Sequence, residues 1–330
     1  MLLNNKISSV LVCFVLLLLS VWQCKKDAQI IVQSIPFDCR QIDTNCPSSP
    51  FGTIYLGPVK NCSPFFNPNN SDEFLYVEID TLGNSTIVIY NLLSKQKKYV
   101  IAKNHYTFSA VNWSKNNWIL YGDYTDHQIY KIKTDGTNLT KLTNASGWFS
   151  YPVSTSVNEI LASFSNLNSQ NYMVKMDFNG NIYDSIQNGY YEMGNISNCY
   201  QLACLDNSTP LRSAITVRDT GRIKSFVYIP IDDKNRNSSL LSIAWHPNCE
   251  DIYFTNIYLD INKVNIRSYK QNIVKMGCYL DRYGVISISP DGNKIIAEKM
   301  HHYFDTLCHE YYNTDLVILN IDGTNEQKVF

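Results

Sequence analysis

The sequence of 330 residues has few charged side chains, which make up 17% of it. Lys and Arg total 28 against 29 Asp and Glu, so the formal net charge is −1 and there is no basic excess. Proteins that bind nucleic acid normally carry such an excess or a basic stripe, so the composition argues against a nucleic-acid partner. Hydrophobic residues account for 45% of the chain, a content that excludes intrinsic disorder.

Several signatures of catalysis and cofactor binding are also absent. The sequence contains no Gly-x-Ser-x-Gly motif, no phosphate-cradling loop and no dinucleotide fingerprint, so we expect no cofactor. It contains no Cys-x-x-Cys pair, which makes a cysteine zinc site unexpected. His309-Glu310-Tyr311-Tyr312-Asn313 begins like the zinc-protease signature, but Asn313 stands where the second histidine belongs and the context is not helical.

Long apolar runs are missing apart from Val10 to Trp22. Its length is below the roughly 20 residues that a membrane-spanning helix needs and fits the core of a signal peptide, which we predict over residues 1–23. Cys24 follows, and then Lys25-Lys26-Asp27.

A cysteine in this place, followed by Lys-Lys-Asp, resembles the lipoprotein signals of Gram-negative bacteria, particularly those of the Bacteroidetes type. The resemblance implies that Cys24 is lipidated, that the lipid anchors the protein to a membrane, and that it lies in the outer membrane or the periplasm. The alternatives are a cleaved secretory signal with an incidental cysteine, or a short uncleaved anchor. All three export the protein.

Apart from Cys13 and Cys24 the chain has eight cysteines, and an even number in an exported protein predicts disulfides. The local pairs Cys39 with Cys46 and Cys199 with Cys204 are the first candidates. The alternative for each cysteine is a small buried hydrophobic residue.

The body of the chain repeats. Each unit reads as two strands, a looser loop, a third strand, a tight turn and a fourth strand. The turns Asp135-Gly136, Asn179-Gly180 and Asp322-Gly323 take the same place in three units, and such dipeptides supply the positive φ angles of two-residue hairpins.

The spacing of the units defines the architecture. Steps of 47, 40, 43, 49 and 43 residues separate the six positions taken as anchors, which are Asn67, Ser114, Ser154, Ser197, His246 and Ser289. Four strands per period, with no helical periodicity, are typical of a β-propeller blade. We therefore predict an all-β, six-bladed propeller of four-stranded antiparallel blades over residues 63–330, preceded by an extended, Cys- and Pro-rich lead-in over 24–62.

Trp113-Ser114, Trp245-His246-Pro247 and Ile288 to Lys294, each followed by an apolar strand, resemble the WD40-like repeats of TolB-type propellers. The resemblance covers about four-fifths of the chain. It implies a platform for protein interactions. The TolB family also has an N-terminal α/β domain, for which this sequence leaves no room. Within the lead-in, residues 52–56 can pair as an edge strand. We expect Trp113, Trp118, Trp245 and Tyr121 to pack between blades.

The loops between the second and third strands are the expected contact face, because loops vary freely on rigid blades. The longest is predicted over residues 301–313. Its candidate contact residues are His301, His302, Tyr303, Asp305, His309, Glu310 and Tyr311.

Three interpretations of this loop remain possible: a partner-contact surface, an ordinary solvated loop, and a metal site formed by His301, Asp305 and His309. Asp123 and His127 are further candidates in another loop, although an Asp-rich turn explains them equally well.

Together these observations predict a non-enzymatic, exported binding scaffold, expected to be monomeric. Its partner would be a protein, peptide or glycan of the cell envelope, held at the loop face or the mouth of the channel. The alternative is an exported hydrolase or lyase with a metal or carboxylates at the channel mouth, because propellers also carry such chemistry.

Overall fold

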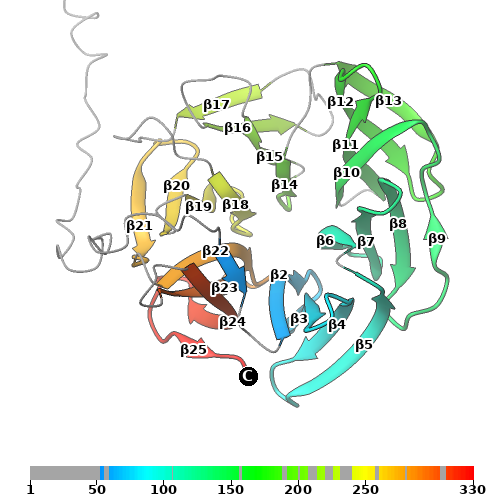
Figure 1. Cartoon of the computed structure of the whole chain (residues 1–330). Coiled ribbons are helices and arrows are strands. Elements are labelled where there is room, and N and C mark those ends of the chain that lie inside the picture. Colours follow the sequence, from blue (N-terminus) through cyan, green and yellow to red (C-terminus); the bar gives the residue numbers. More distant parts are fainter. Residues whose placement is uncertain are drawn as a thin grey trace, which may run out of the picture. The chain divides into compact units, whose positions relative to one another are not determined.

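The computed structural model describes residues 53–55, 59–105, 107–155, 158–187, 192–199, 201–206, 214–219, 226–230, 240–256, 260–278, 281–304 and 310–330. Their strands form an all-β, six-bladed propeller (Figure 1), so the predicted fold class is confirmed. The predicted signal peptide and the candidate cysteines Cys24, Cys39 and Cys46 lie outside these residues.

The first three blades each consist of four consecutive strands. In the first these are β2 (Val59–Asn67), β3 (Asn70–Asp80), β4 (Ser85–Asn91) and β5 (Gln96–Lys103). In the second they are β6 (Phe108–Trp113), β7 (Trp118–Asp123), β8 (Gln128–Lys133) and β9 (Thr140–Lys141). In the third they are β10 (Gly147–Ser154), β11 (Glu159–Asn166), β12 (Asn171–Asp177) and β13 (Ile182–Gln187).

The remaining blades follow the same order, except that the last has extra strands. The fourth contains β14 (Glu192–Ile196), β15 (Gln201–Asp206), β16 (Ala214–Asp219) and β17 (Phe226–Pro230). The fifth contains β18 (Leu240–Trp245), β19 (Asp251–Asn256), β20 (Ile261–Asn265) and β21 (Gln271–Lys275). The sixth contains β22 (Asp281–Ile288), β23 (Lys294–Phe304), β24 (Glu310–Asn320), β25 (Gln327–Lys328) and β1 (Thr53–Tyr55).

Within each blade consecutive strands pair in antiparallel fashion, and the first strand lies at the centre of the ring. Figure 1 shows β6, β14 and β18 around the centre and β5, β13 and β21 at the outside. Each inner strand contacts the inner strand of the next blade. The predicted anchor positions fall at or next to the ends of the inner strands. β2 begins at Val59, ahead of the predicted domain start at residue 63.

Apolar side chains fill the spaces between neighbouring blades, because strands buried on both faces carry Val, Ile and aromatic residues on both sides. Trp113 and Tyr121 lie in the cluster between the first two blades and Trp245 in the cluster between the fourth and fifth, as expected. Trp118 is different. It is only partly buried, and the ammonium groups of Lys131 and Lys133 lie 4.5 and 4.3 Å from the centre of its ring.

The outer edge of the last blade is covered in two pieces. β1 pairs in parallel with the start of β24, and β25 pairs with its later part. The expected edge strand within residues 52–56 is thus confirmed. Side-chain packing closes the ring: Ile296 and Leu316 of the last blade share a cluster with Phe74 of the first. Phe330 packs on Tyr76, with ring centroids 5.4 Å apart.

The three predicted Gly-containing turns join the third and fourth strands of their blades. Only the glycine has a positive φ: 84° at Gly136, 86° at Gly180 and 85° at Gly323. The Gly136 N–H donates to the carbonyl of Lys133. A type I turn followed by a left-handed glycine has this pattern, so the prediction of two consecutive positive φ angles was wrong.

Each of these glycines also touches the preceding blade. A Cβ atom would lie 2.8 Å from the Val100 carbonyl oxygen at Gly136, 2.0 Å from that of Leu142 at Gly180, and 2.3 Å from that of Val274 at Gly323. Real Cβ atoms essentially never approach so closely. Glycine is therefore required twice, by the turn and by the contact between blades.

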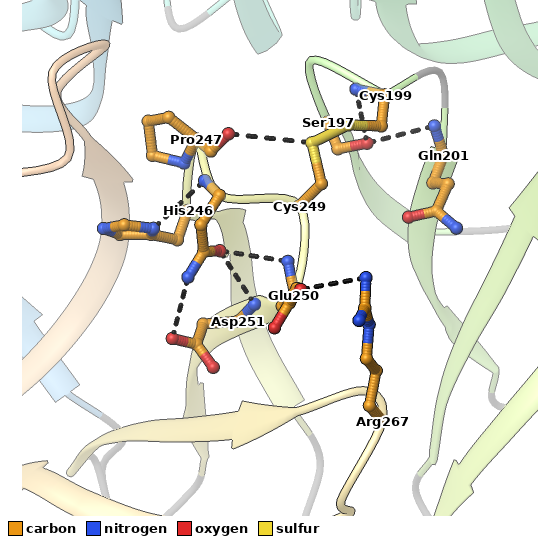
Figure 2. Close-up of a disulfide and its surroundings, with 10 residues drawn as sticks. Ser197, Cys199, Gln201, His246, Pro247, Cys249, Glu250, Asp251 and Arg267 are labelled. Atoms are coloured by element: carbon orange, nitrogen blue, oxygen red, sulfur yellow. Dashed lines mark hydrogen bonds and ion pairs between the residues drawn. A yellow bond between two sulfur atoms is a disulfide. The ribbon is translucent and has the colours of Figure 1, made fainter.

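We call the end of the propeller that carries the turns between strands one and two and between strands three and four the turn face, and the opposite end the loop face. On the turn face a Cys199–Cys249 disulfide joins the fourth and fifth blades (Figure 2). The predicted Cys199–Cys204 pairing was wrong. Cys204 is buried within β15, where alternation points it into the cluster with β10 and β11, and its thiol donates to the carbonyl of Thr216.

Polar contacts continue this connection around the turn face. The Asn248 N–H donates to Nδ1 of His246 (labelled in Figure 2), so Nε2 carries the hydrogen and donates to the carbonyl of Gly292 in the sixth blade, at 3.2 Å. An ion pair of 3.3 Å between Lys294 and Asp72 then joins the sixth blade to the first.

Two side-chain amides complete this series on the other half of the ring. Asn69 donates to the carbonyl of Lys115 at 2.8 Å, which joins the first and second blades. Asn116 donates to Oδ1 of Asn158 at 3.0 Å, which joins the second and third. Among the described residues, no helix is long and apolar enough to cross a membrane.

Candidate binding site in the central channel

All six inner strands are interrupted at about the same height. In each, the register with the second strand shifts, for example between Cys62 and Phe65 in β2 and between Ser150 and Val153 in β10. Such β-bulges bend a strand and leave a residue outside the ladder. Because every inner strand has one, the bulges together form a ring in the wall of the channel.

Three residues at these bulges have positive φ angles although they are not glycines. The angles are 54° at Ser63, 45° at Ala110 and 51° at Tyr151. A non-glycine residue in this region costs about 1–3 kcal/mol, and such strain is concentrated at functional sites. All three residues line the central cavity.

The cavity occupies the middle of the channel and has a volume of about 150 Å³. A cavity of this size accepts a benzene-sized group. The described residues that line it all have uncharged side chains: Ser63, Pro64, Phe65, Ala110, Val111, Asn112, Tyr124, Tyr151, Pro152, Val153, Asn195, Ser242, Ile243, Val285 and Ile286. A second cavity of about 90 Å³ lies at the turn-face mouth, beside His246 and Pro247.

Asn112 and Asn195 provide amide groups in the wall of the cavity. Oδ1 of Asn112 accepts from the N–H of Ser154 in the next blade, and Oδ1 of Asn195 accepts from the N–H of Trp245, both at 3.3 Å. Their NH₂ groups remain available as donors to a molecule in the channel.

The buried charges near the channel lie behind its wall. Glu298 is 6% exposed, does not line the cavity, and accepts hydrogen bonds from the N–H groups of Val285 and Ser63 at the bulges. Burial raises its pKa, whereas Lys60 opposes that rise. Burial, and then Glu298, raise the pKa of Cys62 to about 12, so its thiol stays protonated and is a poor nucleophile.

The loop predicted over residues 301–313 is largely a hairpin instead. β23 continues to Phe304 and β24 starts at Glu310, because aromatic residues favour paired strands. His301 and His302 therefore point to opposite faces. Nδ1 of His301 lies 2.6 Å from a carboxylate oxygen of Asp281, whereas His302 is buried and stacks on Tyr312.

Only part of the predicted metal site can be placed. Asp305 and His309 lie outside the described residues, and of Tyr303, Glu310 and Tyr311 only the backbone is described, with Tyr303 opposite Tyr311 and Phe304 opposite Glu310. In the described part of the chain, no group of three His, Cys, Asp or Glu side chains is arranged to hold a metal ion. The three-ligand set remains a prediction.

Asp123 ends β7 in the second blade, and His127 ends the loop between β7 and β8. Asp123 forms an ion pair of 3.1 Å with Lys103 and accepts from the N–H of Thr125, so it organises a turn. The ring of His127 stacks on Trp148 with centroids 4.8 Å apart. These residues and those of the last blade are in separate loops.

The channel wall and Trp148 were missed by sequence reasoning. An Asn within a strand gives no sign that it faces a cavity, and an exposed Trp looks like a core Trp in sequence. Trp148 is 61% exposed and Tyr124, which lines the cavity, is 47% exposed. The Gly147 that precedes Trp148 was the available signal, because it marks a close approach of the chain.

Comparison with known proteins supports the fold and goes no further. No known family and no curated protein matches the sequence. A putative TolB from Agrobacterium tumefaciens superposes with a TM-score of 0.60 at 12% identity, over 76% of this chain and 89% of that one.

Two enzymes are also similar in structure. A puromycin hydrolase gives a TM-score of 0.55 at 9% identity, over 90% of this chain, which spans 56% of the hydrolase. An oligogalacturonate lyase from Vibrio parahaemolyticus gives 0.52 at 11% identity, over 82% of this chain and 78% of that one. The chain is thus a six-bladed β-propeller that resembles TolB in structure.

Proposed function

We propose that this propeller is a non-enzymatic binding module that takes up part of a protein, peptide or glycan of the cell envelope at its channel and loop face. The uncharged cavity lined by aromatic rings and side-chain amides carries the proposal. Binding pockets are typically apolar with a few well-placed polar groups, and this wall has that composition. The six bulges fix its shape.

The enzymatic alternative has less support. A general acid or base has to reach the substrate, yet the described residues that line the cavity include no carboxylate, histidine or cysteine. Glu298, with its raised pKa, binds backbone N–H groups behind the wall. Cys62 has a raised pKa and is buried.

We also propose that the protein acts outside the cytoplasm, anchored through a lipid at Cys24. The Cys199–Cys249 disulfide supports export, because disulfides persist in oxidising compartments. Cys278 is disulfide-bonded as well.

Filling the channel tests the binding function. Val285→Trp places an indole at a position that lines the cavity. We expect it to weaken binding to peptide and glycan arrays, and to extracts of the native envelope, by about tenfold or more, because the volume is then occupied. Val285→Phe is a milder variant if the first does not fold.

Leu93→Trp is the matched control, because Leu93 is 76% exposed, lies in the turn between β4 and β5 on the turn face, and does not line the cavity. It should bind as the wild type does. A folded Val285→Trp protein with undiminished binding would contradict the proposal.

A further inference from the structure

An aromatic surface lies at the loop-face rim of the channel, between the second and third blades. His127 ends the loop between β7 and β8, and Trp148 starts β10; their rings stack at 4.8 Å with planes 24° apart. Trp148 is 61% exposed, so one stacked face is used and much of the indole remains open to solvent. We call His127, Trp148 and Tyr124 the rim platform.

The rim platform is held rigidly from below. Gln128 is 5% exposed, and its Nε2 lies within 3.2–3.3 Å of the carbonyls of Asp126, Ala145 and Gly147. The Phe149 N–H also donates to the carbonyl of His127 at 2.9 Å. A buried amide that holds both segments fixes Trp148 relative to His127, and fixed aromatic groups lose little entropy on binding.

Glycine makes this approach possible. At Gly147, where φ is 147°, a Cβ atom would lie 2.5 Å from the ring of Phe164 and 2.7 Å from the carbonyl oxygen of Ser165. The chain therefore passes directly over β11 before it presents Trp148.

The rim platform continues into the channel. Tyr124 belongs to the platform and to the cavity lining, and Tyr151 of the same strand as Trp148 lines the cavity too. The same cavity is lined by the amides of Asn112 and Asn195, so a ligand that extends from Trp148 to these tyrosines would meet them. Together these groups offer flat apolar faces and neutral hydrogen-bonding groups.

The charges next to the rim platform are paired within the protein. Asp126 forms an ion pair of 2.8 Å with Lys141 and accepts from the Tyr130 hydroxyl at 2.7 Å. Asp123 is paired with Lys103. None of the described residues that line the cavity has a charged side chain to compensate a charged ligand there, and burying an uncompensated charge is costly.

The bulges disfavour an extended peptide as the occupant. A peptide that adds to a sheet needs a regular run of unpaired backbone groups along an edge. The inner edge of every blade faces the channel, and each is broken by a register shift. Bulges protect edges from strand addition.

From these observations we infer that the rim platform and the cavity bind a neutral saccharide, with one sugar ring stacked on Trp148 and its neighbour at the channel mouth. A pyranose ring has a face of C–H groups that suits an aromatic ring, and hydroxyls at its edge that suit amides and phenols. This inference rests on the proposed binding function and names its ligand class.

The experiment measures binding of neutral hexasaccharides to the full exported chain by calorimetry and saturation-transfer NMR, with cellohexaose, xylohexaose and chitohexaose as probes and hexagalacturonate as the charged comparison. At least one neutral probe should bind more tightly than hexagalacturonate. Trp148→Ala should weaken it about tenfold or more, and Trp148→Phe by less, since a smaller aromatic face remains.

Tyr99→Ala is the matched control, because Tyr99 is also 61% exposed but lies on the outer strand β5. It should bind as the wild type does. Full affinity in Trp148→Ala, tighter binding of hexagalacturonate, or no binding of any neutral probe up to about 10 mM would overturn the inference. If peptides bind instead and Val285→Trp abolishes that binding, the binding function stands and the saccharide assignment fails.

Discussion

The two ends of this propeller are built on different principles. On the turn face, neighbouring blades are joined by a disulfide, an ion pair, a histidine hydrogen bond and two amides, and turn glycines press against the preceding blade. On the loop face the described residues include an exposed stacked Trp148 and the strained residues at the bulges, which lead into the cavity.

This difference is one of degree. Blades are also joined near the loop face, by the Lys103–Asp123 ion pair and by the Phe149 N–H that donates to the His127 carbonyl. The glycines that press on the preceding blade lie on the turn face, whereas the strained Ser63, Ala110 and Tyr151 lie at the channel bulges. Strained backbone persists only where the surrounding structure imposes it. Substitutions at the two ends should therefore change stability in opposite directions.

The largest expected effect comes from opening the disulfide. The double variant Cys199→Ser/Cys249→Ser should lose about 2–4 kcal/mol of unfolding free energy in urea titrations, because the bond closes a loop between residues 50 apart in sequence. Cys204→Ala removes a buried thiol from the same blade and should cost less, about 1 kcal/mol. If both variants lost the same unfolding free energy, the disulfide would contribute no more stability than the buried thiol of Cys204. Thiol labelling of both Cys199 and Cys249 in native protein would refute its presence.

A turn glycine should have the next largest effect. Gly180→Ala places a Cβ 2.0 Å from the Leu142 carbonyl oxygen and should lower the unfolding free energy by about 2–3 kcal/mol. Gly323→Ala and Gly136→Ala should follow in this order, because their contacts are 2.3 and 2.8 Å.

Gly83→Ala provides the control for this series. Gly83 has a φ of 81° like the others, but a Cβ atom there meets nothing within 4 Å. The variant should lose only about 1 kcal/mol of unfolding free energy, which is the cost of the positive φ angle alone. If all four Gly→Ala variants lowered the melting temperature equally, contact with the preceding blade would not be the reason for glycine at these positions.

The smallest effect, opposite in sign, is expected in the channel wall. Ala110→Gly removes a single methyl group at a φ of 45°, where glycine is unstrained. The variant should be as stable as the wild type or more stable by up to about 1 kcal/mol. A clear destabilisation in thermal melts would show that the bulge is not strained.

Sequence alone revealed the fold because its signals are local. Asp-Gly and Asn-Gly turns recur at a fixed place, and the first-strand ends follow a period in the forties, so blade number and strand order could be predicted. The positive φ of Gly180 was predictable, but its contact with Leu142 was not, because that depends on the neighbouring blade.

The candidate site was harder to predict because it is assembled from six separate strands. Asn112 and Asn195 are far apart in sequence, and no local pattern shows that they share a cavity. The same reason explains the wrong partner for Cys199: Cys204, which is near in sequence, is buried in the cluster between the third and fourth blades, whereas Cys249 comes from the fifth. Clusters of His and Tyr drew attention to residues 301–313, where chemistry-bearing residues are dense, but β23 extends to Phe304 and β24 begins at Glu310.

In the side-chain amides of Asn112 and Asn195, the oxygen and the nitrogen have different roles. The oxygen of each accepts from the backbone of the following blade, while both residues line the cavity. An occupant that accepts a hydrogen bond from that nitrogen takes nothing from the junction between blades. If the channel binds a ligand as proposed, its occupation and release would leave these junctions between blades intact.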